Sequence, residues 1–164
     1  MAAQLSHFPN DRYLDKNEAL ADVLLIQISA IDNLKKKLGA PMGRLSRGAP
    51  QPYLSEAWRS GRSLHNMLAT LDGARAIWNG SNGRPGIKSL IDDSDLVRKI
   101  DHAYDTARAQ LESFQQPLFS LVSESDTTAL DALYESFDTL HRIHHNELAQ
   151  RLDIQIGFNA ADGD

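Results

Sequence analysis

The sequence predicts an all-α protein: one four-helix-bundle-like domain over residues 1–164, with a long loop between its first two helices and an extended C-terminal tail. Four long segments repeat apolar residues at steps of three and four, the spacing that a helix buries in a bundle. No segment between them alternates apolar and polar residues as a strand in a sheet does. A chain of 164 residues can also bury a core without disulfides or metals.

The first helix is predicted from Asp11 to Leu38. Residues 1–10 form a loose lead-in, in which Pro9 is a turn signal just before Asp11 as the cap. Gly39 then ends the helix. Its buried stripe is expected to consist of Leu20, Leu24, Ile28, Ile31, Leu34 and Leu38.

The second helix is predicted from Pro52 to Trp78 and carries two neighbouring faces. The apolar face consists of Leu54, Ala57, Gly61, Leu64, Leu68, Leu71 and Trp78. The polar face, at the same spacing, consists of Ser55, Arg59, Arg62, Ser63 and Asn66. Two guanidinium groups in a row with small polar side chains can bind an anion, a carboxylate or a backbone carbonyl.

The connection over residues 39–52 is rich in glycine and proline, so it is predicted to be a long, irregular and rigid loop. It also carries Arg44, Ser46 and Arg47. Two interpretations follow. Either the loop is simply solvated, or it folds over the arginines of the second helix and completes a binding surface.

The second half of the chain is predicted to add two further long helices. One runs over residues 95–114 with Ser94 as its cap, and the last opens at Ser125 and Asp126. The shorter elements are a turn at 80–86, a helical turn at 87–91 and an apolar turn at 118–122. The last helix is expected to bury Leu130, Leu133, Phe137, Leu140, Leu148 and Leu152.

Composition excludes several classes of function. A net charge of −5 argues against a nucleic-acid partner, because such proteins usually carry a basic surplus. No apolar run reaches the ~18 residues that a membrane span requires. The absence of cysteine excludes disulfides and thiolate chemistry. Because the first residues lack the pattern of a secretion signal, we expect either a cytosolic protein or a piece of a longer exported one.

The most metal-like group of residues is His141, His144, His145 and Glu147. His141 and His145 share one helical face, and His144 and Glu147 form an H-x-x-E pair. A zinc or iron site needs a third ligand, and the H-E-x-x-H signature is absent. The alternative is structural, because His144 falls on the apolar stripe and is then a hydrogen-bonded core residue.

The C-terminal tail, residues 154–164, combines an extended pattern with oxygen-rich side chains. Ile154, Ile156 and Phe158 alternate with polar residues. The oxygen ligands are Asn159, Asp162 and Asp164. They can bind a hard cation or pair with the arginines of the second helix, and the alternative is a loose acidic terminus.

Two segments carry a resemblance to a known family. SEAWRSGRSLHNMLATLDGARAIW at residues 55–78 and LDIQIGFNAADGD at 152–164 resemble the C-terminal half of imelysin-like proteins, also described as insulin-cleaving peptidases or iron-regulated envelope proteins. The resemblance covers residues 15–164, and GFNAADGD is its most specific part. It implies an all-helical fold of two bundle-like halves, a location in the periplasm or cell envelope, and a role in iron uptake.

The resemblance also assigns residues. The family's G-x-H-x-x-E motif is absent, since Arg142 stands where the glycine would precede His144, so no metal role passes to His144 or Glu147. Site positions near the contact between the two halves are implied for Trp58, Arg59, Ser60, Arg62, Ser63, Gly157, Phe158, Asn159, Asp162, Gly163 and Asp164.

We therefore expect a non-catalytic binding domain that acts in iron uptake. Its expected partner is the N-terminal half of the same family fold or a second copy of itself, with iron or another divalent metal in the full-length protein. Two alternatives stay open: the C-terminal portion of an imelysin-type metallopeptidase, and a plain helical interaction or dimerisation module.

Overall fold

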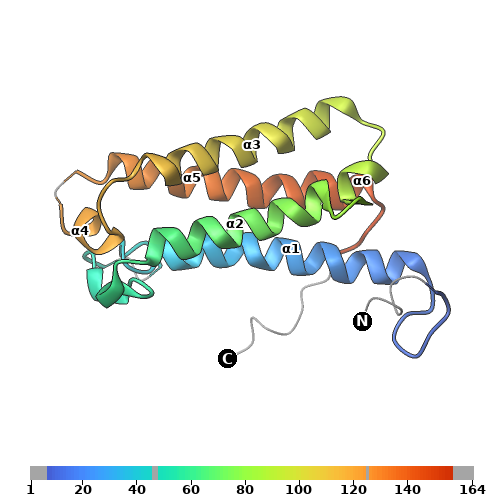
Figure 1. The fold of residues 1–164 in the computed structure, drawn as a ribbon, viewed down its shortest axis with the longest axis horizontal. Helices are drawn as coiled ribbons and strands as arrows, with labels where there is room; N and C mark the ends of the chain where they lie inside the picture. Colours follow the sequence, from blue (N-terminus) through green and yellow to red (C-terminus); the bar gives the residue numbers. More distant parts are fainter. Residues whose placement is uncertain (1–6, 46–47, 125, 157–164) are drawn as a thin grey trace.

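The computed structural model describes residues 7–45, 48–124 and 126–156, and these are mostly helical (Figure 1). The long helices of this part are α1 (Lys16–Gly39), α2 (Ser63–Asn79), α3 (Ser94–Ser113) and α5 (Thr128–Arg142). The last continues as the π-helical segment η5 (Ile143–Leu148) and as α6 (Ala149–Arg151). No helix in the described residues is long and apolar enough to cross a membrane. The predicted all-α fold class is confirmed.

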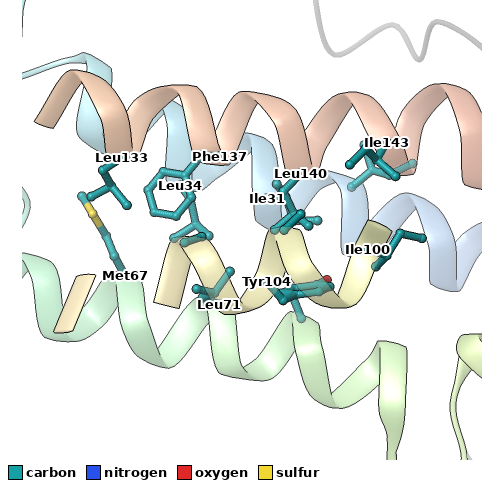
Figure 2. Close-up of a cluster of buried hydrophobic side chains, with 14 of the residues drawn as sticks. Ile31, Leu34, Met67, Leu71, Ile100, Tyr104, Leu133, Phe137, Leu140 and Ile143 are labelled. Atoms are coloured by element: carbon teal, nitrogen blue, oxygen red, sulfur yellow. The ribbon is translucent and has the colours of Figure 1, made fainter. Parts of the chain in front are cut away.

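The four long helices surround one hydrophobic core. Helix α1 packs on α2 and α5, and α3 packs on the same two helices. Figure 2 shows side chains from all four helices meeting between them. The labelled residues are Ile31, Leu34, Met67, Leu71, Ile100, Tyr104, Leu133, Phe137, Leu140 and Ile143. Burial of these apolar surfaces is the main favourable contribution to folding.

Helices α1 and α3 each begin after an aspartate that caps them. The Asp15 carboxylate accepts backbone hydrogen bonds of 2.8 and 3.0 Å from the first turn of α1. The Asp93 carboxylate accepts two of 3.0 Å from the first turn of α3. These bonds satisfy donors that the start of a helix leaves free. The predicted caps, Asp11 and Ser94, are therefore wrong.

The predicted second helix is wrong at its N-terminal end. The chain there forms two 3-10 turns before α2, η2 (Pro52–Leu54) and η3 (Trp58–Ser60). Ala57 and Gly61 have φ angles of 54° and 65°, in the left-handed region, which a right-handed helix cannot contain. Helix α2 starts only at Ser63, whose hydroxyl donates to the backbone oxygen of Glu56. Leu54, expected in the buried stripe, is 54% exposed.

The remaining connections follow the prediction closely. They are the hairpin strands β1 (Gly80–Ser81) and β2 (Arg84–Pro85), the 3-10 turn η4 (Ile87–Leu90) and the short helix α4 (Leu118–Ser123). Gly80 has a φ of 86°, and a side chain there would collide with the backbone oxygen of Arg84, so the turn requires glycine. Helix α5 begins at Thr128, whose backbone N–H donates to the carboxylate of Asp126.

Candidate functional site

Three aromatic rings gather where the segment between α1 and α2 meets α4. Figure 1 shows this segment and α4 together at the left end of the bundle. Tyr53 of η2 meets Trp58 of η3 edge-on, with ring centroids 5.0 Å apart and planes at 87°. Trp58 stacks on Phe119 of α4 at 5.6 Å and 26°, and Tyr53 meets Phe119 at 5.1 Å. Aromatic pairs with this spacing are worth about 0.5–1.5 kcal/mol each. The rings therefore hold both turns against α4.

This cluster is partly open to solvent. The Tyr53 side chain is 67% exposed, while Trp58 and Phe119 are half-buried. The exposed Arg59 guanidinium lies 4.7 Å from the centroid of the Trp58 ring, a cation–π contact. We call Tyr53, Trp58, Arg59 and Phe119 the aromatic surface. Trp, Tyr and Arg are the residues that dominate binding energy at protein interfaces.

The polar row predicted on the second helix is not a single row in the structure. Ser55 is buried, and its hydroxyl has no hydrogen-bond partner in the described residues. The Ser60 hydroxyl donates to the backbone oxygen of Ala57 at 3.1 Å. Arg62 is exposed, and Asn66, half-buried, lies on α2. Because η3 and the two left-handed residues interrupt the helix, the predicted helical face is divided between a loop and α2.

The partner proposed for the arginines lies outside the described residues. Neither Arg59 nor Arg62 forms an ion pair within the part of the chain that the structure describes. Asn159, Asp162 and Asp164 belong to residues 157–164, which are not described. Pairing of the tail with the arginines thus stays a prediction. The tail's first residues, 154–156, are described, and their two isoleucines pack half-buried against the core.

The loop after α1 does not bring its arginine to the aromatic surface. Arg44 pairs with Asp131 at 2.7 Å and Glu135 at 3.2 Å, and its guanidinium lies 4.3 Å from the Tyr134 ring centroid. All three partners belong to α5. Arg44 therefore fastens the loop to α5. Ser46 and Arg47 of the same loop lie outside the described residues.

His144 is a core residue. Its Nδ1 lies 2.8 Å from the backbone oxygen of Leu140, so this nitrogen carries the hydrogen and donates it. Its Nε2 lies 3.4 Å from the Tyr104 hydroxyl, and the two rings meet edge-on at 5.6 Å. Burial lowers the pKa of His144 to about 4, so the ring is neutral at pH 7. This is the structural role that its position on the apolar stripe predicted.

The four candidate metal ligands do not converge on one point. Glu147 lies on the surface and pairs with Lys99 of α3 at 2.5 Å, whereas His144 faces the core. The rings of His141 and His145 lie side by side at 5.6 Å. Among the described residues no group of three or more His, Asp or Glu side chains could hold a metal ion. The H-x-x-E pair of His144 and Glu147 therefore does not fit the metal that an imelysin-like resemblance implies.

Comparison with known proteins decides the family. A sequence model of the Imelysin family matches residues 1–144, most of the chain. The chain belongs to the imelysin family. No curated protein and no solved structure matches it. The resemblance inferred from residues 55–78 is thereby confirmed, and the GFNAADGD ending lies beyond the matched residues.

The core of this imelysin-family chain contains a polar network that the sequence did not predict. The Gln27 amide nitrogen donates to the Tyr104 hydroxyl at 3.0 Å and to the backbone oxygen of Ala74 at 3.2 Å. The Tyr104 hydroxyl in turn lies next to His144. Burial raises the pKa of Tyr104, so the network is neutral. The one signal in the sequence was Gln27 itself, a polar residue between apolar positions of α1.

A hollow of this imelysin-family chain lies where the start of α1 meets α6. It has a volume of about 490 Å³, within the range of small-molecule sites. Its lining residues are Phe8, Lys16, Asn17, Ala19, Leu20, Val23, Leu90, Arg151 and Leu152. The sequence did not predict it, because its wall combines residues from four separate segments.

Proposed function

We propose that this imelysin-family chain is a binding domain without peptidase activity of its own, acting in iron uptake at the cell envelope. The observation that carries the binding role is the aromatic surface, where three packed rings and an arginine stand on the protein exterior. The iron-uptake role and the envelope location are supported by the imelysin resemblance, because the family is associated with both.

The partner that suits this surface is a protein. Leu54, which directly follows Tyr53 in η2, is 54% exposed and adds apolar side-chain surface beside it. An apolar centre with aromatic residues and arginine is the composition of interface cores. We infer that the partner is the N-terminal half of the imelysin fold or, in its absence, a second copy of this chain.

Replacing Trp58 by alanine is expected to weaken association by about 30-fold or more, the loss typical of a residue central to an interface. The indole would no longer fill the partner's surface or support the Arg59 guanidinium. Sedimentation velocity over a concentration series measures self-association. Titration with a purified imelysin-family domain that contains the G-x-H-x-x-E motif measures binding to the other half.

Leu14→Ala is the matched control, because Leu14 is a large apolar side chain, 78% exposed, that lies outside the aromatic surface. It is expected to change either dissociation constant by less than about 3-fold. A monomeric wild-type chain that also fails to bind the G-x-H-x-x-E domain would contradict the proposed binding role. Equal effects of Trp58→Ala and Leu14→Ala would place the interface elsewhere.

The peptidase alternative makes a separate prediction. A metallopeptidase would cleave insulin in a reaction that chelators stop, and we expect no such cleavage by this chain alone.

The iron-uptake role is tested in the cell. Removal of the gene that encodes this chain is expected to slow growth under iron limitation and to leave growth in iron-rich medium unchanged. Equal growth in both media would contradict the iron-uptake role.

A further inference from the structure

Two imidazole rings lie side by side where α5 passes into η5. His141 and His145 are four residues apart, with ring centroids separated by 5.6 Å and planes inclined at 31°. His145 is exposed and His141 half-buried, so the pair can be reached from solvent. Two imidazoles that share one metal ion at about 2.1 Å per nitrogen place their centroids roughly 5 Å apart. The observed spacing therefore needs only a small side-chain rotation.

Each of the two rings has a nitrogen that can offer its lone pair to a metal ion. The Nδ1 of His145 lies 2.9 Å from the side-chain oxygen of Asn146, which can only accept a hydrogen bond. Nδ1 therefore carries the hydrogen, and Nε2 keeps its lone pair. An acceptor on the second nitrogen is the usual way in which a metal-binding histidine is oriented. Neither nitrogen of His141 has a hydrogen-bond partner in the described residues.

Nearby cations are paired with carboxylates, which offset part of their positive charge at the rings. Lys35 pairs with Asp138 at 2.8 Å, and Arg142 pairs with the same carboxylate at 2.9 Å. Lys36 pairs with Asp32 at 2.8 Å. The paired carboxylates of Asp138 and Asp32 thus reduce the repulsion that these cations would exert on a bound divalent cation.

We propose that His141 and His145 bind a divalent late transition-metal ion, each through one ring nitrogen, with water in the remaining coordination positions. Imidazole favours copper, nickel and zinc, and affinity is expected to be highest for Cu²⁺. The site is separate from the H-x-x-E pair and does not depend on the proposed binding function. Water-filled positions follow from the ligand count, since no third His, Asp or Glu joins the pair in the described part of the chain.

Titration of the purified full chain with Cu²⁺, Ni²⁺ and Zn²⁺ tests this site. His141→Ala and His145→Ala are each expected to weaken Cu²⁺ binding at least tenfold. The double variant is expected to lose no more than either single variant, because one imidazole alone cannot chelate. Electron paramagnetic resonance of the wild-type Cu²⁺ complex is expected to show hyperfine coupling to two nitrogens. Asn146→Ala is expected to cause a smaller loss, since it only frees the orientation of His145.

His65→Ala and His102→Ala are the matched controls, because both histidines are exposed and stand apart from the pair. They are expected to bind Cu²⁺ as the wild type does. Circular dichroism verifies that each variant is folded, and should His141→Ala unfold, His145→Ala and His145→Gln provide the test. The proposal would be overturned if His145→Ala bound Cu²⁺ with wild-type affinity. It would also be overturned if the loss of Cu²⁺ affinity in the double variant equalled the sum of the two single losses, or if the wild-type Cu²⁺ complex showed hyperfine coupling to only one nitrogen.

Discussion

Trp78→Ala is expected to lower the free energy of unfolding by about 3–5 kcal/mol, the cost of removing a large aromatic side chain from a packed core. Trp78 is fully buried in α2, and its Nε1 donates to Asp101 at 2.8 Å. The same carboxylate accepts from Lys88 of η4 at 2.6 Å, so the indole connects α2 with α3 and η4. Domains of this size have only about 5–15 kcal/mol of stability, so the variant is expected to be marginally folded. Urea unfolding followed by circular dichroism measures the difference.

Trp58→Ala is the matched control, since the chain contains two tryptophans and the other one is half-buried at the aromatic surface. Its removal is expected to cost about 1–2 kcal/mol through the two lost ring contacts. Trp78→Phe retains most of the buried volume and lacks the hydrogen bond to Asp101, so its cost is expected to lie between the two. A Trp58→Ala variant as unstable as Trp78→Ala would contradict the assignment of Trp78 to the centre of the core.

The fold class was predictable because each long helix must bury its apolar stripe, and the periodicity of that stripe appears directly in the sequence. Ile31 and Leu34 in α1, and Phe137 and Leu140 in α5, lie in the core as their spacing predicted. The start of α2 was not predictable in this way. Leu54 continues the helical spacing across Ala57, but Ala57 adopts a left-handed conformation. In the folded chain η2 contacts α4, which comes from a distant part of the sequence. The periodicity of a single segment does not reveal such a contact.

The candidate sites were harder to predict from the sequence than the fold class, because their geometry depends on contacts between segments that are far apart in the chain. Arg59 was singled out from the spacing of polar residues and Trp58 by the imelysin resemblance, and both lie on the aromatic surface. Phe119, which stacks on Trp58, was missed because nothing in the sequence pairs α4 with η3. The alternatives for His144 could be separated only by its surroundings. A histidine on an apolar stripe can be a ligand or a core residue, and its hydrogen bond to Leu140 decides for the core.

Lowering the pH from about 7 towards 4 is expected to destabilise the protein mainly through His144. Burial lowers the pKa of this residue from 6.5 to about 4, so between these values the unfolded chain binds a proton that the folded chain does not. Stability is therefore highest above pH 6.5 and falls as the pH drops, by roughly 3 kcal/mol near pH 4. The groups facing the ring, Tyr104 and Trp78, carry no negative charge that could stabilise its protonated form.

Urea unfolding near pH 7 and near pH 4.5, with a chelator present, measures this loss in the wild type and in His144→Gln. Glutamine offers a donor and an acceptor but does not titrate, so the variant is expected to be less stable at pH 7 and to change little with pH. His141 has a pKa lowered by burial and by Lys35, so His141→Gln is expected to remove a smaller part of the slope. Carboxylates with lowered pKa values, such as Asp101 and Asp138, lose their contribution only at lower pH. An unchanged pH slope in His144→Gln would show that the buried ring does not control the acid response.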